Sequence, residues 1–271
     1  MVSKYPITFG ICTFNRKDVL QKSVQSLLHV KNIDKVNIRI FDDCSTDYDR
    51  TFLEELVPEA CSIKQNQRNV GADKNTSIMY EDFLKSGDEW LLNADSDLIY
   101  HSDIIDEILR YQDKCGGFVT LFNCINHNDI SHTELFDIKE SVGAAGCLLH
   151  RDVVELILNS IRYRSVSFDT VFCKVLRENG YNLYATKQSF VQHIGVTGFN
   201  SGEISFDYGR NFQCDSLINA EIIEYTFETY AKKVNQFKNK KNWRIYNSFA
   251  IIPRKIDRYG KKLREIMDLN Q

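Results

Sequence analysis

The chain has 271 residues, 43% of them hydrophobic and 26% charged, and a formal net charge of −3 at pH 7. This is the composition of a globular protein, and no apolar run approaches the ~20 residues that a membrane-spanning helix needs. None of the eight cysteines forms a C-x-x-C pair, so we expect reduced thiols in a cytoplasmic protein rather than a disulfide or zinc framework. An apolar strand begins at Ile7, without the pattern of a signal peptide.

The charges are unevenly distributed along the chain. Residues 1–231 contain 22 Lys and Arg against 34 Asp and Glu, whereas residues 232–271 contain 12 against 3. The sequence therefore predicts an acidic domain over residues 1–200 and a helical, basic C-terminal extension over residues 201–271.

The first hundred residues alternate between strand and helix patterns. Short apolar runs bounded by polar residues predict strands, and apolar residues spaced by three and four predict helices. Strands are expected at 7–13, 36–41, 61–65 and 90–92, and helices at 17–30, around 52–56 and at 72–85. Ser45 or Thr46 is expected to cap the second helix. This order predicts an α/β fold with a mostly parallel sheet flanked by helices.

Polar turns follow the first, second and fourth of these strands, and the fourth strand ends in Asp95-Ser96-Asp97. Because the carboxyl ends of parallel strands meet at one edge of a sheet, these turns can converge on one ligand. Two carboxylates one residue apart suit Mg²⁺ or Mn²⁺, although the same spacing is also common in solvated loops.

The second part of the chain continues the alternation less regularly. Helices are expected at 102–113, 152–159, 167–178 and 220–237, and strands at 117–122, 147–150, 181–185 and 190–195. Between them, His127 and His132 lie in a polar stretch that we interpret as a surface loop, because no third ligand is placed to complete a metal site. The small residues from Gly143 to Gly146 would let the backbone approach a ligand closely.

Two common nucleotide-binding fingerprints are absent from the sequence. No G-x-G-x-x-G follows the first strand, which argues against a dinucleotide-binding domain, and no G-x-x-x-x-G-K-[ST] is present.

Several segments, taken in order, resemble the family 2 glycosyltransferases with the GT-A fold. The matching segments are Thr13-Phe14-Asn15-Arg16, Phe41 to Asp47, Asn69-Val70-Gly71 with Asn75, Asp95-Ser96-Asp97, Gly143 to Gly146, Phe168-Asp169 with Arg177 to Tyr181, and His193. Cys44 stands where the family pattern has glycine, and Phe168 where it commonly has glutamate. The resemblance covers roughly residues 5–200 and implies a GT-A-like, Rossmann-type sheet.

The resemblance implies a nucleotide-sugar donor. A UDP-sugar is favoured, because Asp42 or Asp43 could accept a hydrogen bond from the N3–H of uracil; the same carboxylates could instead serve turn or capping chemistry. The donor-binding residues that the resemblance implies are Thr13, Asn15, Arg16, Asp42, Asp43, Asn69, Gly71, Lys74, Asp95, Ser96 and Gly146.

The resemblance also implies a metal and a catalytic base. Asp95, Asp97 and His193 would hold Mn²⁺ or Mg²⁺ beside the diphosphate. Asp169 would take the proton of the attacking hydroxyl, and direct displacement would invert the anomeric centre. Each residue also has a plainer interpretation, such as a helix cap for Asp169.

These inferences predict an inverting, metal-dependent glycosyltransferase that acts on a hydroxyl of a glycan, lipid-linked or protein acceptor, with no nucleic-acid partner. A nucleotidyltransferase on a similar sheet is disfavoured, because the G-x-G-x-R loop it needs after the first strand is absent. A non-catalytic nucleotide- or glycan-binding protein on the same fold is the other alternative, against which the intact carboxylates and His193 argue.

The basic extension has two interpretations. Beyond Pro253, apolar and aromatic residues recur at helical spacing among Lys and Arg. Such a segment can lie on an anionic bilayer, as a peripheral contact on the inner face of the membrane. It can equally pack on the domain or against another subunit of a homo-oligomer.

Overall fold

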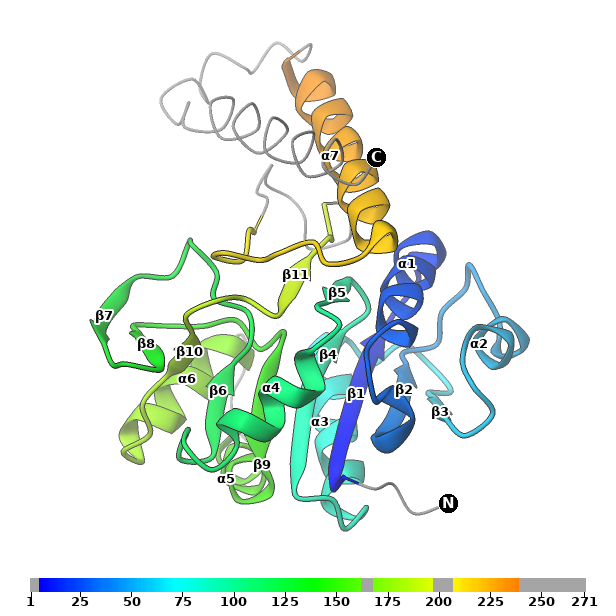
Figure 1. Ribbon diagram of the computed structural model, residues 1–271. Helices are drawn as coiled ribbons and strands as arrows, with labels where there is room; N and C mark the ends of the chain where they lie inside the picture. The colour runs from blue at the N-terminus through cyan, green and yellow to red at the C-terminus, as the bar shows by residue number, and fades with distance from the viewer. Residues whose placement is uncertain (1–4, 162–167, 197–206, 239–271) are drawn as a thin grey trace. The chain divides into compact units, whose positions relative to one another are not determined.

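The computed structural model of the protein describes residues 5–161, 168–196 and 207–238, the side chains of residues 169, 170, 237 and 238 excepted (Figure 1). The described residues fall into two compact units. One holds the residues up to 193 together with 207–213, and the other holds 194–196 together with 214–238.

The first unit is built on a sheet of nine described strands in the order β3-β2-β1-β4-β9-β6-β10-β8-β7. Its first four strands are parallel. They are β1 (Ile7–Thr13), β2 (Asn37–Asp42), β3 (Ser62–Gln65) and β4 (Trp90–Asp95). Because β1 pairs with both β2 and β4, the loops after these three strands leave the same edge of the sheet.

Beyond β4 the sheet is mixed. Antiparallel β9 (Cys147–His150) joins β4 to β6 (Phe118–Thr120), and β10 (Tyr184–Thr186) runs parallel to β6. The hairpin of β7 (Asp129–His132) and β8 (Phe136–Lys139) completes this side. A separate two-stranded ribbon pairs β5 (Leu98–Tyr100) with β11 (Val191–His193), and its register sets Leu98 opposite His193.

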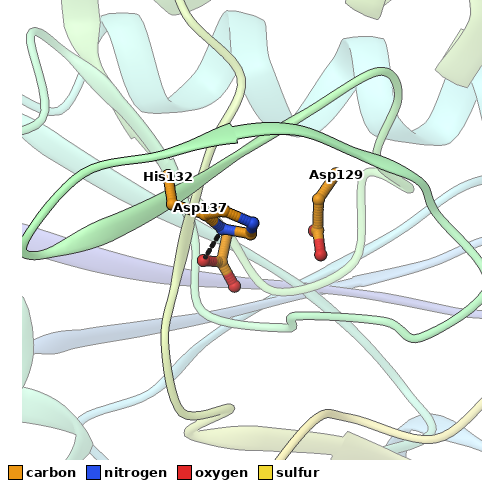
Figure 2. Close-up of side chains that lie close together, drawn as sticks. All are labelled: Asp129, His132 and Asp137. Atoms are coloured by element: carbon orange, nitrogen blue, oxygen red, sulfur yellow. Dashed lines mark hydrogen bonds and ion pairs between the residues drawn. The ribbon is translucent and has the colours of Figure 1, made fainter.

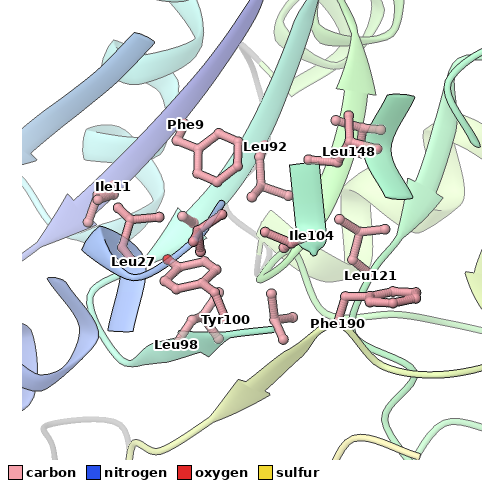
Figure 3. Packing of buried hydrophobic residues seen from close by; sticks show 14 of the residues in the cluster. Phe9, Ile11, Leu27, Leu92, Leu98, Tyr100, Ile104, Leu121, Leu148 and Phe190 are labelled. Atoms are coloured by element: carbon pink, nitrogen blue, oxygen red, sulfur yellow. The ribbon is translucent and has the colours of Figure 1, made fainter. Parts of the chain in front are cut away.

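Helices cover both faces of the sheet, and alternation along the strands assigns each residue to one face. On one face, side chains such as Phe9, Ile11 and Leu92 pack with α1 (Lys17–Leu28), α2 (Arg50–Leu56) and α4 (Ile104–Tyr111) (Figure 3). On the other face, Leu91 and its neighbours pack with α3 (Ala72–Leu84), α5 (Arg151–Ile161) and α6 (Phe168–Glu178). A short 3-10 helix, η1 (Ile33–Lys35), precedes β2.

The predicted α/β class with its parallel strands and flanking helices is confirmed. Two local expectations are corrected. The residue that caps α2 is Asp49, whose carboxylate accepts from the amide of Phe52 at 2.9 Å, and neither Ser45 nor Thr46 has this role. The polar stretch around His127 and His132, interpreted as a surface loop, contains the hairpin β7–β8.

The second unit contains α7 (Leu217–Lys238), close to the helix predicted at 220–237. Within the described ranges, no helix combines the length and apolarity required to cross a membrane. The aromatic and basic segment after Pro253, with its two predicted roles, lies outside the described residues.

Candidate functional site

The loops that follow β1 and β2 are joined by hydrogen bonds. The amide of Asn15 donates to Ser45 Oγ at 2.7 Å, and Asn15 Oδ1 accepts from the amide of Thr46 at 2.7 Å. Asn15 and Arg16 both adopt a left-handed backbone conformation, with φ of 54° and 60°, which is unfavourable for most L-residues. The bonds between the loops hold this turn, from which the Arg16 side chain reaches the end of β4.

Asp42, at the end of β2, is fully buried and bonded within the protein. Its carboxylate accepts from Tyr48 Oη at 3.2 Å and from Gln65 Nε2 at 2.8 Å, in addition to Ser45. The Tyr48 hydroxyl also lies 2.7 Å from Thr13 Oγ1. Burial, reinforced by the charge of Asp42, raises the pKa of Tyr48 well above its usual value. Tyr48 therefore stays neutral and links the ends of β1 and β2.

Asp43 organises the loop before α3. Its Oδ1 accepts from the amide of Val70 at 2.8 Å and from Asn66 Nδ2 at 2.9 Å, and its Oδ2 accepts from the amide of Gly71 at 2.8 Å. Gly71 has φ of 88°, a conformation that glycine adopts without strain. Asp43 therefore has the turn-stabilising role considered for it in the sequence. Its hydrogen bonds bring a third loop to the same edge of the sheet.

The residues predicted to bind a donor differ in exposure. Thr13, Asp42, Asp43, Ser96 and Gly146 are buried, Asn15, Arg16, Gly71 and Asp95 are partly exposed, and Asn69 and Lys74 are exposed. The loops after β1, β2 and β4 meet, as the strand order predicts. Gly146 does not border an open surface. A Cβ on this residue would stand 2.7 Å from Val191 Cγ2, so Gly146 packs closely against strand β11 of the two-stranded ribbon.

Asp97 joins three distant parts of the chain. It follows β4, is only 4% exposed, and accepts through Oδ2 from Arg16 Nη1 at 2.6 Å. His193 Nε2, at the end of β11, lies 3.2 Å from the same oxygen. Arg16 Nη2 also donates to Ser96 Oγ at 3.1 Å. The structure therefore brings three of the predicted site residues, Arg16, Asp97 and His193, into direct contact.

The charges of this group stabilise one another. Burial opposes the ionisation of Asp97, but His193 and Arg16 outweigh it and hold the pKa of Asp97 well below its usual range. Burial likewise disfavours the charged imidazolium, yet the adjacent Asp97 raises the pKa of His193 above its usual value. The carboxylate is therefore ionised at neutral pH.

One oxygen of Asp97 is suited to a further cation. Among the described residues, no group donates a hydrogen bond to the buried Oδ1 of Asp97. An ionised, buried oxygen without a donor is costly unless a ligand satisfies it. Carboxylate oxygens and an imidazole are ligand types that suit Mg²⁺ or Mn²⁺, but within the described residues the ligand atoms of Asp95, Asp97 and His193 do not all lie within 4.8 Å of one another.

A different group has ligand atoms close enough to hold a metal. Within the described part of the chain, Asp129, His132 and Asp137 offer atoms that all lie within 4.8 Å of one another (Figure 2). The hairpin β7–β8 supplies these two carboxylates beside His132, which sequence spacing did not reveal. The His132 side chain is 59% exposed, and His127 is elsewhere, with Nδ1 2.9 Å from Ser141 Oγ.

Protein cations already neutralise these two carboxylates. Arg210 bridges them, with 2.8 Å to Asp129 and 2.8 Å to Asp137. Lys139, which is buried, lies 2.7 Å from Asp129, and Lys187 lies 2.7 Å from Asp137. A divalent ion would have to displace these partners, so the group is better described as an ion-pair cluster. We refer to Asp129, Asp137, Lys139, Lys187 and Arg210 as the hairpin cluster.

The predicted base stands at the start of a helix. Helix α6 begins at Phe168, so Asp169 belongs to its first turn, while its side chain lies outside the described residues. Phe168 packs edge-on against Tyr80 of α3, with ring centroids 5.7 Å apart. Phe168, one of the two residues that depart from the family pattern, is therefore part of the hydrophobic core.

Sequence reasoning missed Tyr48 and Arg210. Tyr48 follows the acidic turn after β2, and an aromatic residue there carries no motif of its own. Arg210 lies in the predicted C-terminal extension, before its first expected helix, and its partners are more than seventy residues away in sequence. No local signal identifies either residue, because their roles depend on partners brought together by the fold.

Comparison with known proteins identifies the family. The sequence profile described as "Glycosyl transferase family 2" matches residues 8–178, and the chain therefore belongs to this family. No curated protein matches the chain.

Among solved structures, S. aureus TarS residues 1–349 is similar, with a TM-score of 0.51 and 13% identity over 82% of this chain and 64% of that chain. The same fragment in complex with UDP-GlcNAc gives a TM-score of 0.50 and 13% identity, covering 82% and 65%. The chain thus spans less than two thirds of these neighbours. At this level of identity the likeness establishes the GT-A-like fold.

Proposed function

We propose that the protein is an inverting, metal-dependent glycosyltransferase that moves a sugar from a UDP-sugar to an acceptor hydroxyl. The observation that carries the proposal is the contact of Arg16, Asp97 and His193 at the sheet edge, with Oδ1 of Asp97 left for a cation. Membership of glycosyl transferase family 2 supports the reaction class.

The donor nucleotide is proposed to lie over the loops after β1 and β2. Thr13, Asn15, Asp42 and Asp43 form the inner part of this region, and the exposed Asn69 and Lys74 flank it from the loop before α3 and its first turn. Asp42 and Asp43 are buried and bonded within the protein, so a hydrogen bond from the N3–H of uracil to either carboxylate would have to replace one of these bonds. UDP-GlcNAc is the ligand of one TarS structure, and this favours UDP over other nucleotides.

Asp95, Asp97 and His193 would hold the divalent cation. When bound, the cation would neutralise the charge that develops on the leaving diphosphate. Arg16 lies at the same edge as a fixed positive charge, and the loop contacts of Asn15 orient it. These groups are held in place before the donor arrives, so little reorganisation is needed in the transition state.

The acceptor is proposed to approach from α6. A hydroxyl is a weak nucleophile, and the Asp169 carboxylate would take its proton as the bond to the anomeric carbon forms. Attack on the face opposite the diphosphate inverts the anomeric centre. The segment from Gly143 to Gly146 borders this region, and a Cβ on Gly143 would meet no atom within 4 Å, which leaves space beside its backbone for an acceptor.

The test is a donor-hydrolysis and transfer screen with UDP-, GDP- and dTDP-sugars in Mn²⁺ or Mg²⁺. We expect metal-dependent release of UDP, lost in Asp97→Ala and reduced about 10²–10⁴-fold in Asp169→Asn. Asp113→Asn, an exposed carboxylate of the same chain, is the matched control. Binding of UDP without turnover of any donor would instead support a non-catalytic nucleotide-binding protein, and absence of UDP binding would refute the UDP-sugar proposal.

A further inference from the structure

Gln192 connects the strand that carries His193 to a segment that returns from later in the chain. Its side chain is fully buried. Its Nε2 donates to the carbonyl of His193 at 2.7 Å and to the carbonyl of Asp207 at 2.8 Å, and its Oε1 accepts from the amide of Gly209 at 2.9 Å. The amide group thus uses both donor hydrogens and its acceptor on the backbone around His193.

The returning segment, residues 207–213, is fixed at several points. The amide of Ser189 donates to the carbonyl of Arg210 at 2.8 Å, and the amide of Arg210 donates to the carbonyl of Asn123 at 2.7 Å. A Cβ on Gly209 would stand 2.6 Å from Ser189 Oγ, so only glycine permits this close approach. The guanidinium of Arg210 then extends into the hairpin cluster.

The alternation of side chains along β11 lets Gln192 bond to the backbone of His193 without contacting Asp97. Neighbouring side chains on a strand point to opposite faces, so Gln192 points away from Asp97 while His193 points toward it. Strand β11 has only three residues and pairs, among the described strands, with β5 alone. A strand of this length needs further contacts to fix the position of its last residue.

We propose that Gln192 is a positioning residue that holds His193 against Asp97, with the hairpin cluster as its support through Arg210. The consequence for catalysis rests on the proposed function. The structural part does not, because it concerns only the contact between His193 and Asp97. Mutation of a residue that orients a metal-ligating histidine typically weakens metal binding 10–100-fold.

The first test observes the His193 ring directly by ¹⁵N NMR of the metal-free full chain, with its signals assigned by comparison with His193→Gln. Gln192→Met keeps the length of the side chain and removes all three hydrogen bonds. We expect the His193 signals to shift toward those of a solvated ring or to broaden, with the other five histidines unchanged. Gln213→Leu, at an exposed glutamine of the same unit, should leave the His193 signals in place.

Arg210→Lys is the second variant, in case Gln192→Met does not fold. Lysine keeps the positive charge but cannot bridge Asp129 and Asp137, so the same signals should move by a smaller amount. Unchanged His193 signals in a folded Gln192→Met protein would overturn the inference, as would unchanged signals in Arg210→Lys if only that variant folds.

The second test measures Mn²⁺ affinity by calorimetry in the presence of UDP. We expect binding about 10–100-fold weaker in Gln192→Met than in wild type, and at most a twofold change in Gln213→Leu. Wild-type affinity in Gln192→Met would overturn the inference while the proposed function stands. If wild type binds neither UDP nor Mn²⁺, the proposed function fails, and the NMR signals of His193 alone decide whether Gln192 positions the ring.

Discussion

Replacing Asp137 by Asn should destabilise the protein strongly, and only above acidic pH. The carboxylate of Asp137 accepts from four donors: His132 Nδ1, Lys187 Nζ, Asn123 Nδ2 and Arg210 Nη1, at 2.8, 2.7, 2.8 and 2.8 Å. Burial opposes its ionisation, but Lys187, His132 and Asn123 hold the pKa of Asp137 well below its usual range. Asparagine keeps the shape and removes the charge.

The expected loss of stability depends on which of the four donors can bond to water once the carboxylate is replaced. Lys187 and His132 are 42% and 59% exposed, so their release costs little. Asn123 is fully buried and Arg210 is partly buried. Losing about 1 kcal/mol for the bond from the neutral donor Asn123 and about 2 kcal/mol for the bond from the charged donor Arg210 gives a loss of about 3 kcal/mol, comparable with breaking a buried ion pair. For a chain of this size the melting temperature should fall by about 6–12 °C.

Urea unfolding at several pH values separates the charge from the packing. Because the folded pKa is depressed, the carboxylate stabilises the fold above its unfolded pKa of about 3.9, and this contribution is lost as the pH falls toward the folded pKa. The difference in unfolding free energy between wild type and Asp137→Asn should therefore be full at pH 7 and narrow below about pH 4. Asp113→Asn should change stability by less than about 0.5 kcal/mol. A difference that stays constant down to pH 3 would refute the electrostatic explanation.

Three further changes test other parts of the structure. Cys44 has φ of 62°, so Cys44→Gly should raise the unfolding free energy by about 0.5–1 kcal/mol, whereas Cys61→Gly, outside the left-handed region, should lower it; equal losses would contradict the strain argument. His193→Ala should weaken Mn²⁺ binding with UDP at least about 10-fold and His132→Ala should not, as measured by calorimetry; the reverse order would move the metal to the hairpin cluster. Tyr48→Phe removes the hydroxyl contacts to the ends of β1 and β2, and should lower stability by about 1 kcal/mol and weaken UDP binding; unchanged UDP affinity would show that Tyr48 has no part in the donor region.

Elements with strong local patterns were predictable from the sequence. The strand expected at 7–13 coincides with β1, because Ile7, Phe9 and Ile11 alternate with smaller residues along a segment that is buried on both faces. The helix expected at 72–85 differs from α3 by one residue. The hairpin β7–β8 was missed because β7 is a mostly exposed edge strand with Ile130 at 62% exposure, and such a strand has no alternation of apolar and polar residues to detect.

The candidate site was predictable in its members but not in its contacts. The acidic turns follow directly from strand order, so their convergence could be inferred before any coordinates. The partner of Asp97 could not: Arg16 lies 81 positions earlier, and its reach depends on two successive residues in the left-handed conformation. Neither residue is glycine, so sequence gives no sign of this turn.

The positioning residue shows where inference from motifs ends. Gln192 precedes a histidine that the resemblance to the family singles out, yet a glutamine in a short strand matches no pattern of its own. Its function in the structure comes from hydrogen bonds with the carbonyl of Asp207 and the amide of Gly209. Both groups belong to a later segment that folds back against β11. A side chain that bonds only to backbone groups does not restrict which residues its partners are, because almost any residue can supply a backbone amide or carbonyl. Of these partners, only Gly209 is restricted in residue type, because a Cβ there would clash with its neighbours. Such residues are found from hydrogen-bond geometry, and the variants at Gln192 and Arg210 test whether that geometry controls His193.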